Sequence, residues 1–246
     1  MPFTFAHPAI VLPLTWLSKR WYSLTGLVIG SVTPDFEYFI RMKVQSTYSH
    51  TWPGLVYFDL PVGLLLCFIF HGIVRNSLFE NLPAVLKKHL MMFTSFNWLG
   101  DFKRRWLVVV VSLLVGSASH ILWDGFTHSS GYFVQIFPVL TNHISIASLS
   151  IPIYKIIQHC SSVVGMCLVA FSITTLPVTQ VNRKIDYKYW LWAASITVTI
   201  TALRLLIADS DRSYGNALVT IISGILLSVI LTPLILKSHS NKYINQ

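Results

Sequence analysis

The sequence predicts an all-α, polytopic membrane protein with about five transmembrane helices and, before them, N-terminal helices that associate with the membrane. Of its 246 residues, 54% are hydrophobic and 11% are charged, whereas a soluble domain carries about 25% charged residues. The nine acidic residues are too few to cover a soluble globule of this length with solvated charge. The apolar residues also gather in runs close to the ~20 residues that cross a bilayer as a helix. These observations exclude a large soluble enzyme and a disordered chain.

The N-terminal region, residues 1–54, contains apolar stretches that are too interrupted to cross a membrane. Ala9–Leu17 and Leu24–Ile40 are broken by charge or by Pro34. We therefore expect helices that pack against the bundle or lie in the membrane interface. No basic segment precedes an apolar stretch and no small-residue cleavage site follows one, so no signal peptide is predicted.

Five apolar segments within residues 55–236 are each long enough to form a membrane-spanning helix. Pro61 and Pro177 would interrupt helices of a soluble protein but are tolerated in membrane helices. Aromatic residues near the segment ends, such as Trp106 and Trp123, are typical of the membrane interface. The predicted spans are Leu55–Val74, Trp106–Trp123, Ser162–Thr179, Tyr189–Ala208 and Ala217–Leu236. With a polar tail at residues 237–246 and no internal repeat or linker, they predict a single integral membrane domain over residues 1–246.

The basic residues predict the orientation of the spans. Six Lys and Arg residues lie within residues 75–105, whereas residues 124–161 contain only Lys155. Because cytoplasmic loops accumulate Lys and Arg, residues 75–105 are expected inside and residues 124–161 outside. The same preference explains the net charge of +9. Since no basic stripe alternates with aromatic residues, nucleic acid is not an expected partner, and membrane lipids are.

The scarce acidic residues recur beside histidines. His120 and Asp124 lie four residues apart at the end of the second predicted span, so both side chains share one helix face with Cβ atoms ~6 Å apart. This spacing suits two ligands of one metal ion, or a ligand and its hydrogen-bond partner. An unpaired charge there costs several kcal/mol, so a divalent cation or His120 must compensate Asp124. His50 is expected near the same membrane face, and His7 and Asp35 join it if the N-terminal segment lies outside.

Nitrogen and oxygen ligands without thiolate favour a borderline or hard divalent metal ion, with zinc first and manganese, iron or cobalt as alternatives. An ion with an open coordination position lowers the pKa of bound water toward ~7. The resulting hydroxide can attack an ester, an amide or a phosphodiester at the membrane face. Glu37, a spare carboxylate two residues after Asp35, is the candidate catalytic base.

Each of these residues also has a structural interpretation. Asp35 and Glu37 follow a proline, and acids in the first turn after a proline are ordinary at the start of a helix. His7, which precedes a proline, could cap the next helix, and His50 could be a solvated loop residue. The histidine–aspartate pair in the second span could simply pin two helices together.

Several stretches closely resemble a family of bacterial membrane proteins catalogued as domain of unknown function 4184, to which no activity is assigned. The matching residues are 1–9 (MPFTFAHPA), 29–39 (IGSVTPDFEYF), 49–51 with 53–55, 120–124 with 126–128, and 154–155 with 158–159. More distantly, the order of ligand-type residues resembles that of inner-membrane metal-dependent hydrolases and of zinc-dependent phospholipase C. This likeness implies localisation in the bacterial inner membrane and a metal site formed by His7, Asp35, His50, His120 and Asp124.

The leading hypothesis is a multi-pass membrane hydrolase that uses a divalent metal ion to cleave a lipid-like or envelope ester or phosphodiester. The second hypothesis is a non-catalytic membrane protein whose His/Asp cluster fixes helix packing or binds a partner. A transporter is the third hypothesis. Charge distributed through several spans would favour it, and only Arg204, in the fourth predicted span, points that way.

Overall fold

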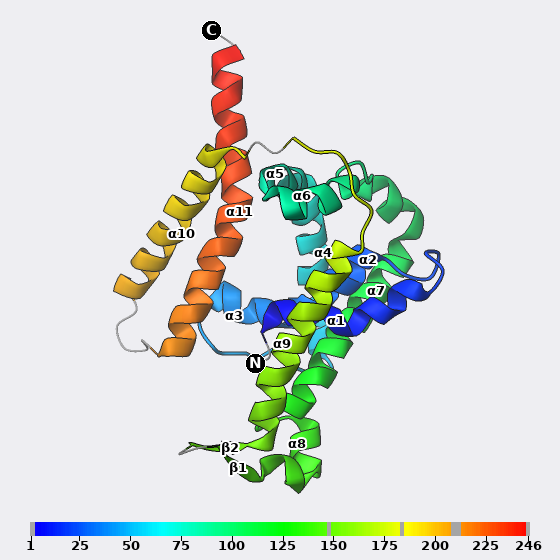
Figure 1. Cartoon of the computed structure of the whole chain (residues 1–246), viewed down its shortest axis with the longest axis vertical. Coiled ribbons are helices and arrows are strands. Elements are labelled where there is room, and N and C mark those ends of the chain that lie inside the picture. The colour runs from blue at the N-terminus through cyan, green and yellow to red at the C-terminus, as the bar shows by residue number, and fades with distance from the viewer. Residues whose placement is uncertain (1–2, 147–148, 183–184, 208–212, 245–246) are drawn as a thin grey trace. The chain divides into compact units, whose positions relative to one another are not determined.

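A computed structural model describes residues 3–146, 149–182, 185–207 and 213–244 of the chain (Figure 1). Helices account for almost all the regular structure in these ranges, which confirms the predicted all-α class. The chain forms two compact units. The first comprises residues 1–35, 48–64 and 100–172, and the second comprises residues 36–47, 65–99 and 173–246. The single integral membrane domain stays a prediction.

The first unit combines short N-terminal helices with two long helices. It contains α1 (Pro8–Val11), α2 (Leu24–Val32), the start of α4 (Leu60–Ile69), most of α7 (Trp98–Thr127), α8 (Tyr132–Ile136) and most of α9 (Ile153–Thr174). Turns of 3-10 helix cover Thr4–Ala6, Leu12–Trp16, Thr33–Asp35 and Pro138–Thr141, and a π turn covers Leu55–Asp59. Strands β1 (His143–Ile146) and β2 (Leu149–Pro152) form an antiparallel pair. The two N-terminal apolar stretches are therefore helical, as predicted.

The second unit is built on two long helices that run side by side in opposite directions (Figure 1). It contains α3 (Phe36–Arg41), α5 (Arg75–Asn81), α6 (Ala84–Leu90), α10 (Tyr187–Ile207) and α11 (Tyr214–Ile244), with a π turn at Phe70–Val74 and a 3-10 turn at Met91–Phe93. The Ser223 hydroxyl donates a hydrogen bond of 2.9 Å to the carbonyl of Phe39, which joins α11 to α3.

Five helical segments of the described chain are long and apolar enough to cross a membrane, which confirms the predicted number and order of spans. They are Leu55–Asn81, Trp98–Ile136, Ile153–Thr174, Tyr187–Ile207 and Tyr214–Lys237. The bounds predicted for the third span, Ser162–Thr179, were wrong at both ends. Its helix ends at Thr174, before Pro177, because proline has no N–H to donate and disfavours helical geometry at the preceding residue.

Glycines allow α2 and α7 to approach one another closely. A Cβ atom at Gly116 of α7 would lie 2.5 Å from the carbonyl oxygen of Leu27, and one at Gly30 of α2 would collide with the carbonyl of Leu113. The Ser117 hydroxyl also donates a 3.0 Å hydrogen bond to the Gly30 carbonyl. Small residues produce such close approaches between membrane helices. This packing brings the end of α2 against the middle of α7.

Gly30→Ala should therefore destabilise the protein. The added methyl group would meet backbone of α7, and overpacking of this kind costs about 1–3 kcal/mol. Gly72→Ala is the matched control, because a Cβ atom at Gly72 meets nothing within 4 Å. Thermal unfolding in detergent should show a lower midpoint for Gly30→Ala alone. Equal midpoints for the two variants would contradict the close contact.

The predicted orientation can be tested with an alkaline phosphatase reporter, which is active only outside the cytoplasm. A fusion after residue 140, in the segment expected outside, should be active. A fusion after residue 95, within the basic segment expected inside, should be inactive, since positive charge holds such loops in the cytoplasm. The reverse pattern of activity would overturn the orientation.

Candidate metal centre

All five predicted metal ligands belong to the first unit, and the structure brings them together from four separate segments. His7 immediately precedes α1, and Asp35 ends the 3-10 turn that follows α2. His50 lies in the turn before residue 55, and His120 and Asp124 lie one turn apart on α7. The close packing of α2 on α7 accounts for the meeting of Asp35 with His120.

Four of the candidate ligands face one another in His–Asp pairs at 3.4–3.5 Å. Oδ1 of Asp35 lies 3.4 Å from Nε2 of His50 and 3.5 Å from Nε2 of His120. Oδ2 of Asp124 lies 3.5 Å and 3.4 Å from the same two nitrogens. Four ligands at ~2.1 Å from a tetrahedral ion lie ~3.4 Å from one another. These four nitrogen–oxygen separations are close to that value, and they are longer than the usual charge-assisted hydrogen bond of ~2.8 Å.

His7 supplies a fifth donor beside this group. Its Nε2 lies 3.7 Å from Oδ1 of Asp124, and its ring stacks on that of His120 with centroids 3.7 Å apart and planes at 13°. His7, Asp35 and His120 form one group of possible metal ligands, and His50, His120 and Asp124 form another. Each group has ligand atoms within 4.8 Å of one another. The two groups share His120, so the five side chains form one continuous cluster.

Hydrogen bonds outside the cluster fix the orientation of the two central histidines. Nδ1 of His120 lies 2.7 Å from the carbonyl oxygen of Ser31. Since a carbonyl only accepts, this nitrogen carries the proton and Nε2 of a neutral His120 offers a lone pair. Nδ1 of His50 is hydrogen-bonded to the Ser49 hydroxyl at 3.0 Å. Metal-binding histidines characteristically use the second ring nitrogen in this way.

Asp35 is oriented by the first residues of the chain. It has no exposed surface, and its Oδ2 accepts a 2.5 Å hydrogen bond from the Thr4 hydroxyl. The preceding turn is held by Thr33, whose hydroxyl donates to the Ile29 carbonyl at 2.7 Å. These contacts leave Oδ1 of Asp35 directed at the histidines.

The cluster leaves several buried polar atoms without hydrogen bonds. Within the described residues, Nε2 of His7, Oδ1 of Asp35, Nε2 of His120 and Oδ1 of Asp124 are buried and have no hydrogen-bond partner. Buried polar atoms are normally satisfied, and leaving one unsatisfied is costly. A divalent cation among these atoms would satisfy them, and its charge would balance two carboxylates with neutral imidazoles. The residues therefore fit a metal ion by donor type, spacing and charge.

The charge states of the three N-terminal ligands follow from their surroundings. Burial, followed by repulsion from His120 when that residue is protonated, lowers the pKa of His7 to about 3, so the His7 imidazole is neutral at pH 7. Burial alone would raise the pKa of Asp35, but His120 and His50 outweigh it and hold the pKa below its usual value. Burial opposes protonation of His50, but its contacts with Asp124 and Asp35 raise its pKa.

Three of the five clustered side chains are closed to solvent and two are partly exposed. The side chains of His7, Asp35 and His120 have no exposed surface, whereas 19% of the His50 side chain and 10% of the Asp124 side chain are exposed. His128, with 28% of its side chain exposed, lies beside them, its Nδ1 3.7 Å from Oδ1 of Asp124. Water and a substrate would reach the cluster past these three residues.

Glu37, the candidate base, belongs to the second unit. Its buried carboxylate accepts hydrogen bonds from Nε of Arg41 and the backbone N–H of Thr47, each at 2.9 Å, and from the Ser46 hydroxyl at 3.2 Å. Through these contacts Glu37 holds the segment that follows α3 in place, which is a structural role. Its role as a base stays a prediction.

Two contributors to the cluster were not anticipated from the sequence. Neither the Thr4 hydroxyl nor the Ser31 carbonyl carries a sequence signal, because serine and threonine are common and every residue has a carbonyl. Trp123 was expected at the end of a span, but it lies inside α7, with its ring 5.2 Å from that of His7. Its position four residues from the helix end follows from the continuation of α7 past Gly125.

The family of the chain is shown by one comparison. The family model described as Domain of unknown function (DUF4184) matches residues 1–234. The chain belongs to this family. The match spans all five ligand candidates of this DUF4184 protein and nearly all of its candidate membrane helices. No significant match is found among curated proteins or among solved structures. The likeness to metal-dependent hydrolases stays a prediction.

Proposed function

We propose that this protein is a membrane-bound, metal-dependent hydrolase of the bacterial inner membrane, which cleaves a lipid-like or envelope ester or phosphodiester. The observation that carries the proposal is the His/Asp cluster, in which facing nitrogen and oxygen atoms of five side chains lie 3.4–3.7 Å apart and several of these atoms are buried without hydrogen bonds. The cluster lies partly on α7, within a segment long and apolar enough to span the membrane. A substrate that reaches the cluster from within the membrane would be a lipid or a lipid-linked molecule.

In this proposal the divalent ion, zinc first and manganese, iron or cobalt as alternatives, is held by His7, Asp35, His50, His120 and Asp124. When bound, such an ion acidifies a coordinated water and polarises a carbonyl or phosphoryl oxygen. The candidate ligands offer only nitrogen and oxygen donors, as do the sets of three histidines, or of two histidines and a glutamate, in catalytic zinc sites.

The chain's own residues then supply orientation and access. The contacts of His120 with Ser31 and of Asp35 with Thr4 fix the ligands before substrate arrives, which is the requirement for a preorganised site. His50 and Asp124 lie where the cluster is exposed, so the scissile group approaches from their side. Nδ1 of His128 donates to the Asp124 carbonyl at 3.1 Å, so in this proposal Nε2 of His128 takes up a proton from the reacting water.

Hydrolysis of bis(p-nitrophenyl) phosphate and p-nitrophenyl esters by the detergent-purified protein tests the function. We expect turnover that requires a divalent metal and is abolished by EDTA. Asp124→Asn should lower kcat/KM at least about 100-fold, since even the loss of an outer-shell partner of a metal site costs 10–100-fold. Asp101→Asn, which changes a carboxylate of α7 that pairs with Arg105 at 3.0 Å, is the matched control. Metal-loaded protein that hydrolyses neither substrate class nor phospholipid in mixed micelles would contradict the proposal.

A further inference from the structure

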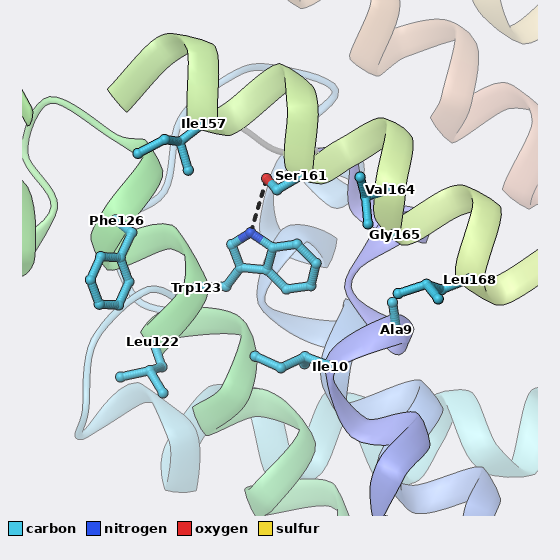
Figure 2. A pocket seen from close by; sticks show the side chains of 10 residues that line it. All are labelled: Ala9, Ile10, Leu122, Trp123, Phe126, Ile157, Ser161, Val164, Gly165 and Leu168. Carbon is cyan, nitrogen blue, oxygen red and sulfur yellow. Dashed lines mark hydrogen bonds between the residues drawn. The ribbon is translucent and has the colours of Figure 1, made fainter. Parts of the chain in front are cut away.

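An apolar pocket of about 390 Å³ lies in the first unit between α1, α7 and α9 (Figure 2). Leu122, Phe126, Val164 and Leu168 contribute to its walls. Ser161 is the polar lining residue, and its hydroxyl accepts a 3.1 Å hydrogen bond from the Trp123 indole and donates to the Gln158 carbonyl at 3.2 Å. With that hydroxyl engaged by the protein, the pocket suits hydrocarbon and offers little to a polar head group.

The pocket shares a wall with the candidate metal centre. On α7, Trp123 lies between the two ligands His120 and Asp124 in sequence, and its ring both lines the pocket and lies 5.2 Å from the ring of His7. On the N-terminal side, Ala9 of the pocket follows His7 by two residues. Pocket and cluster therefore occupy neighbouring faces of the same turns of α7, a helix about 10 Å across with its side chains.

The position of α9 against this wall depends on a glycine. A Cβ atom at Gly165 would lie 2.9 Å from the Ala6 carbonyl oxygen and 3.3 Å from the Trp123 ring. The absence of a side chain lets α9 approach the segment that carries His7. Gly165 therefore keeps α9 close to Trp123, which lines the pocket, and close to Ala6, which precedes His7.

The surroundings of the pocket indicate its occupant. Both α7 and α9 belong to segments long and apolar enough to span a membrane. Leu122, Val164 and Leu168 are 44%, 57% and 48% exposed, so the pocket is open rather than enclosed. In a bilayer, an open apolar pocket between two spans faces lipid hydrocarbon.

We infer that this pocket binds the hydrocarbon chain of a lipid whose polar group lies at the His/Asp cluster. The inference rests on the proposed function for the fate of that polar group, and it makes the substrate an amphiphile that enters sideways from the bilayer. The hydrocarbon chain of the lipid contributes affinity because its methylene groups are buried in the pocket. The cluster then meets the ester or phosphodiester that joins the chain to its head group.

Photolabelling tests chain binding without relying on turnover. The probe is a hexadecyl phosphonate with a diazirine at the chain end, used with the full-length protein in lipid nanodiscs. We expect saturable labelling of the peptides that contain residues 122–126 and 157–168. Val164→Trp, which fills the pocket, should reduce it at least about tenfold, since it displaces several methylenes. Val163→Trp is the control, because Val163 is 65% exposed and does not line the pocket.

Unsaturable labelling spread over all membrane helices, or equal labelling of the two variants, would overturn the inference. A chain-length comparison provides a second readout. Val164→Trp should raise KM for p-nitrophenyl palmitate about tenfold or more and leave that for p-nitrophenyl acetate unchanged. Equal effects on both esters would also count against the pocket. If the protein is labelled saturably but binds no metal, the lipid-chain site is supported and the metal-dependent hydrolase is refuted. The pocket and the proposed function can therefore fail separately.

Discussion

Addition of zinc to the metal-free protein should raise its thermal unfolding midpoint, and His120→Ala should abolish that rise. A ligand that binds only the folded state stabilises it by about 2.7 kcal/mol at a concentration 100 times its Kd. For a chain of this length, that corresponds to roughly 5–10 °C. His120 is completely buried and belongs to both groups of possible ligands, so its removal affects every donor in the cluster. Differential scanning fluorimetry in detergent measures the shift.

His89→Ala is the matched control for this prediction. His89 is also buried, and its Nδ1 is hydrogen-bonded to the Leu176 carbonyl at 2.8 Å in the second unit. Its replacement should lower the midpoint of the metal-free protein and leave the zinc-dependent rise intact. A zinc-dependent rise of normal size in His120→Ala would show that the ion binds elsewhere.

The second large effect is expected for Asp35→Asn, which should raise the Kd for the metal at least about 100-fold. The substitution removes one of the two negative charges that balance a divalent cation while keeping the size of the side chain. Its oxygen can still accept the Thr4 hydroxyl, whose contact with Oδ2 is 2.5 Å in the wild type. Because the side chain has no exposed surface, no anion from solvent can enter to replace the lost carboxylate. Competition with a fluorescent zinc chelator measures the Kd.

Thr4→Val distinguishes coordination by Asp35 from a purely structural role. Valine has the shape of threonine and removes only the hydroxyl that orients the carboxylate. Loss of an outer-shell partner of a metal ligand typically costs 10–100-fold in affinity, so an intermediate Kd is expected. If neither Asp35→Asn nor Thr4→Val changes the Kd, Asp35 is not a ligand.

The fold was largely predictable because membrane spans leave a strong signal in composition. Runs of about 20 apolar residues identify helices without knowledge of what they contact, and all five spans were found. Their ends depend on local backbone chemistry, and the end of the third was misplaced because Pro177 was treated as tolerated within a span. Its helix stops at Thr174 instead.

The cluster was predictable only in part from spacing. The four-residue interval of His120 and Asp124 brings them together on any helix. The meeting of Asp35 with His120, in contrast, depends on the packing of α2 against α7 through Gly30 and Gly116, which no pattern in one sequence reveals. The other ligands were grouped through a resemblance in residue order.

The pocket left no sequence signal at all. On a membrane helix, residues that line a pocket and residues that face lipid are equally apolar. Trp123 illustrates the difficulty, since the same residue at the end of an apolar run is typical of the membrane interface. Its contacts with Ser161 and His7 become apparent only when α9 and the N-terminal segment are in place.

The metal content of the purified protein tests the central claim most directly. Protein from cells grown with added zinc, manganese, iron and cobalt should contain about one divalent ion per chain by mass spectrometry, as expected for one catalytic site. His120→Ala and Asp124→Ala should contain less than about a tenth of that while retaining wild-type helix content, because each removes a ligand. Wild-type protein without stoichiometric divalent metal would contradict the account, and the His/Asp cluster would then be a packing or partner-binding feature.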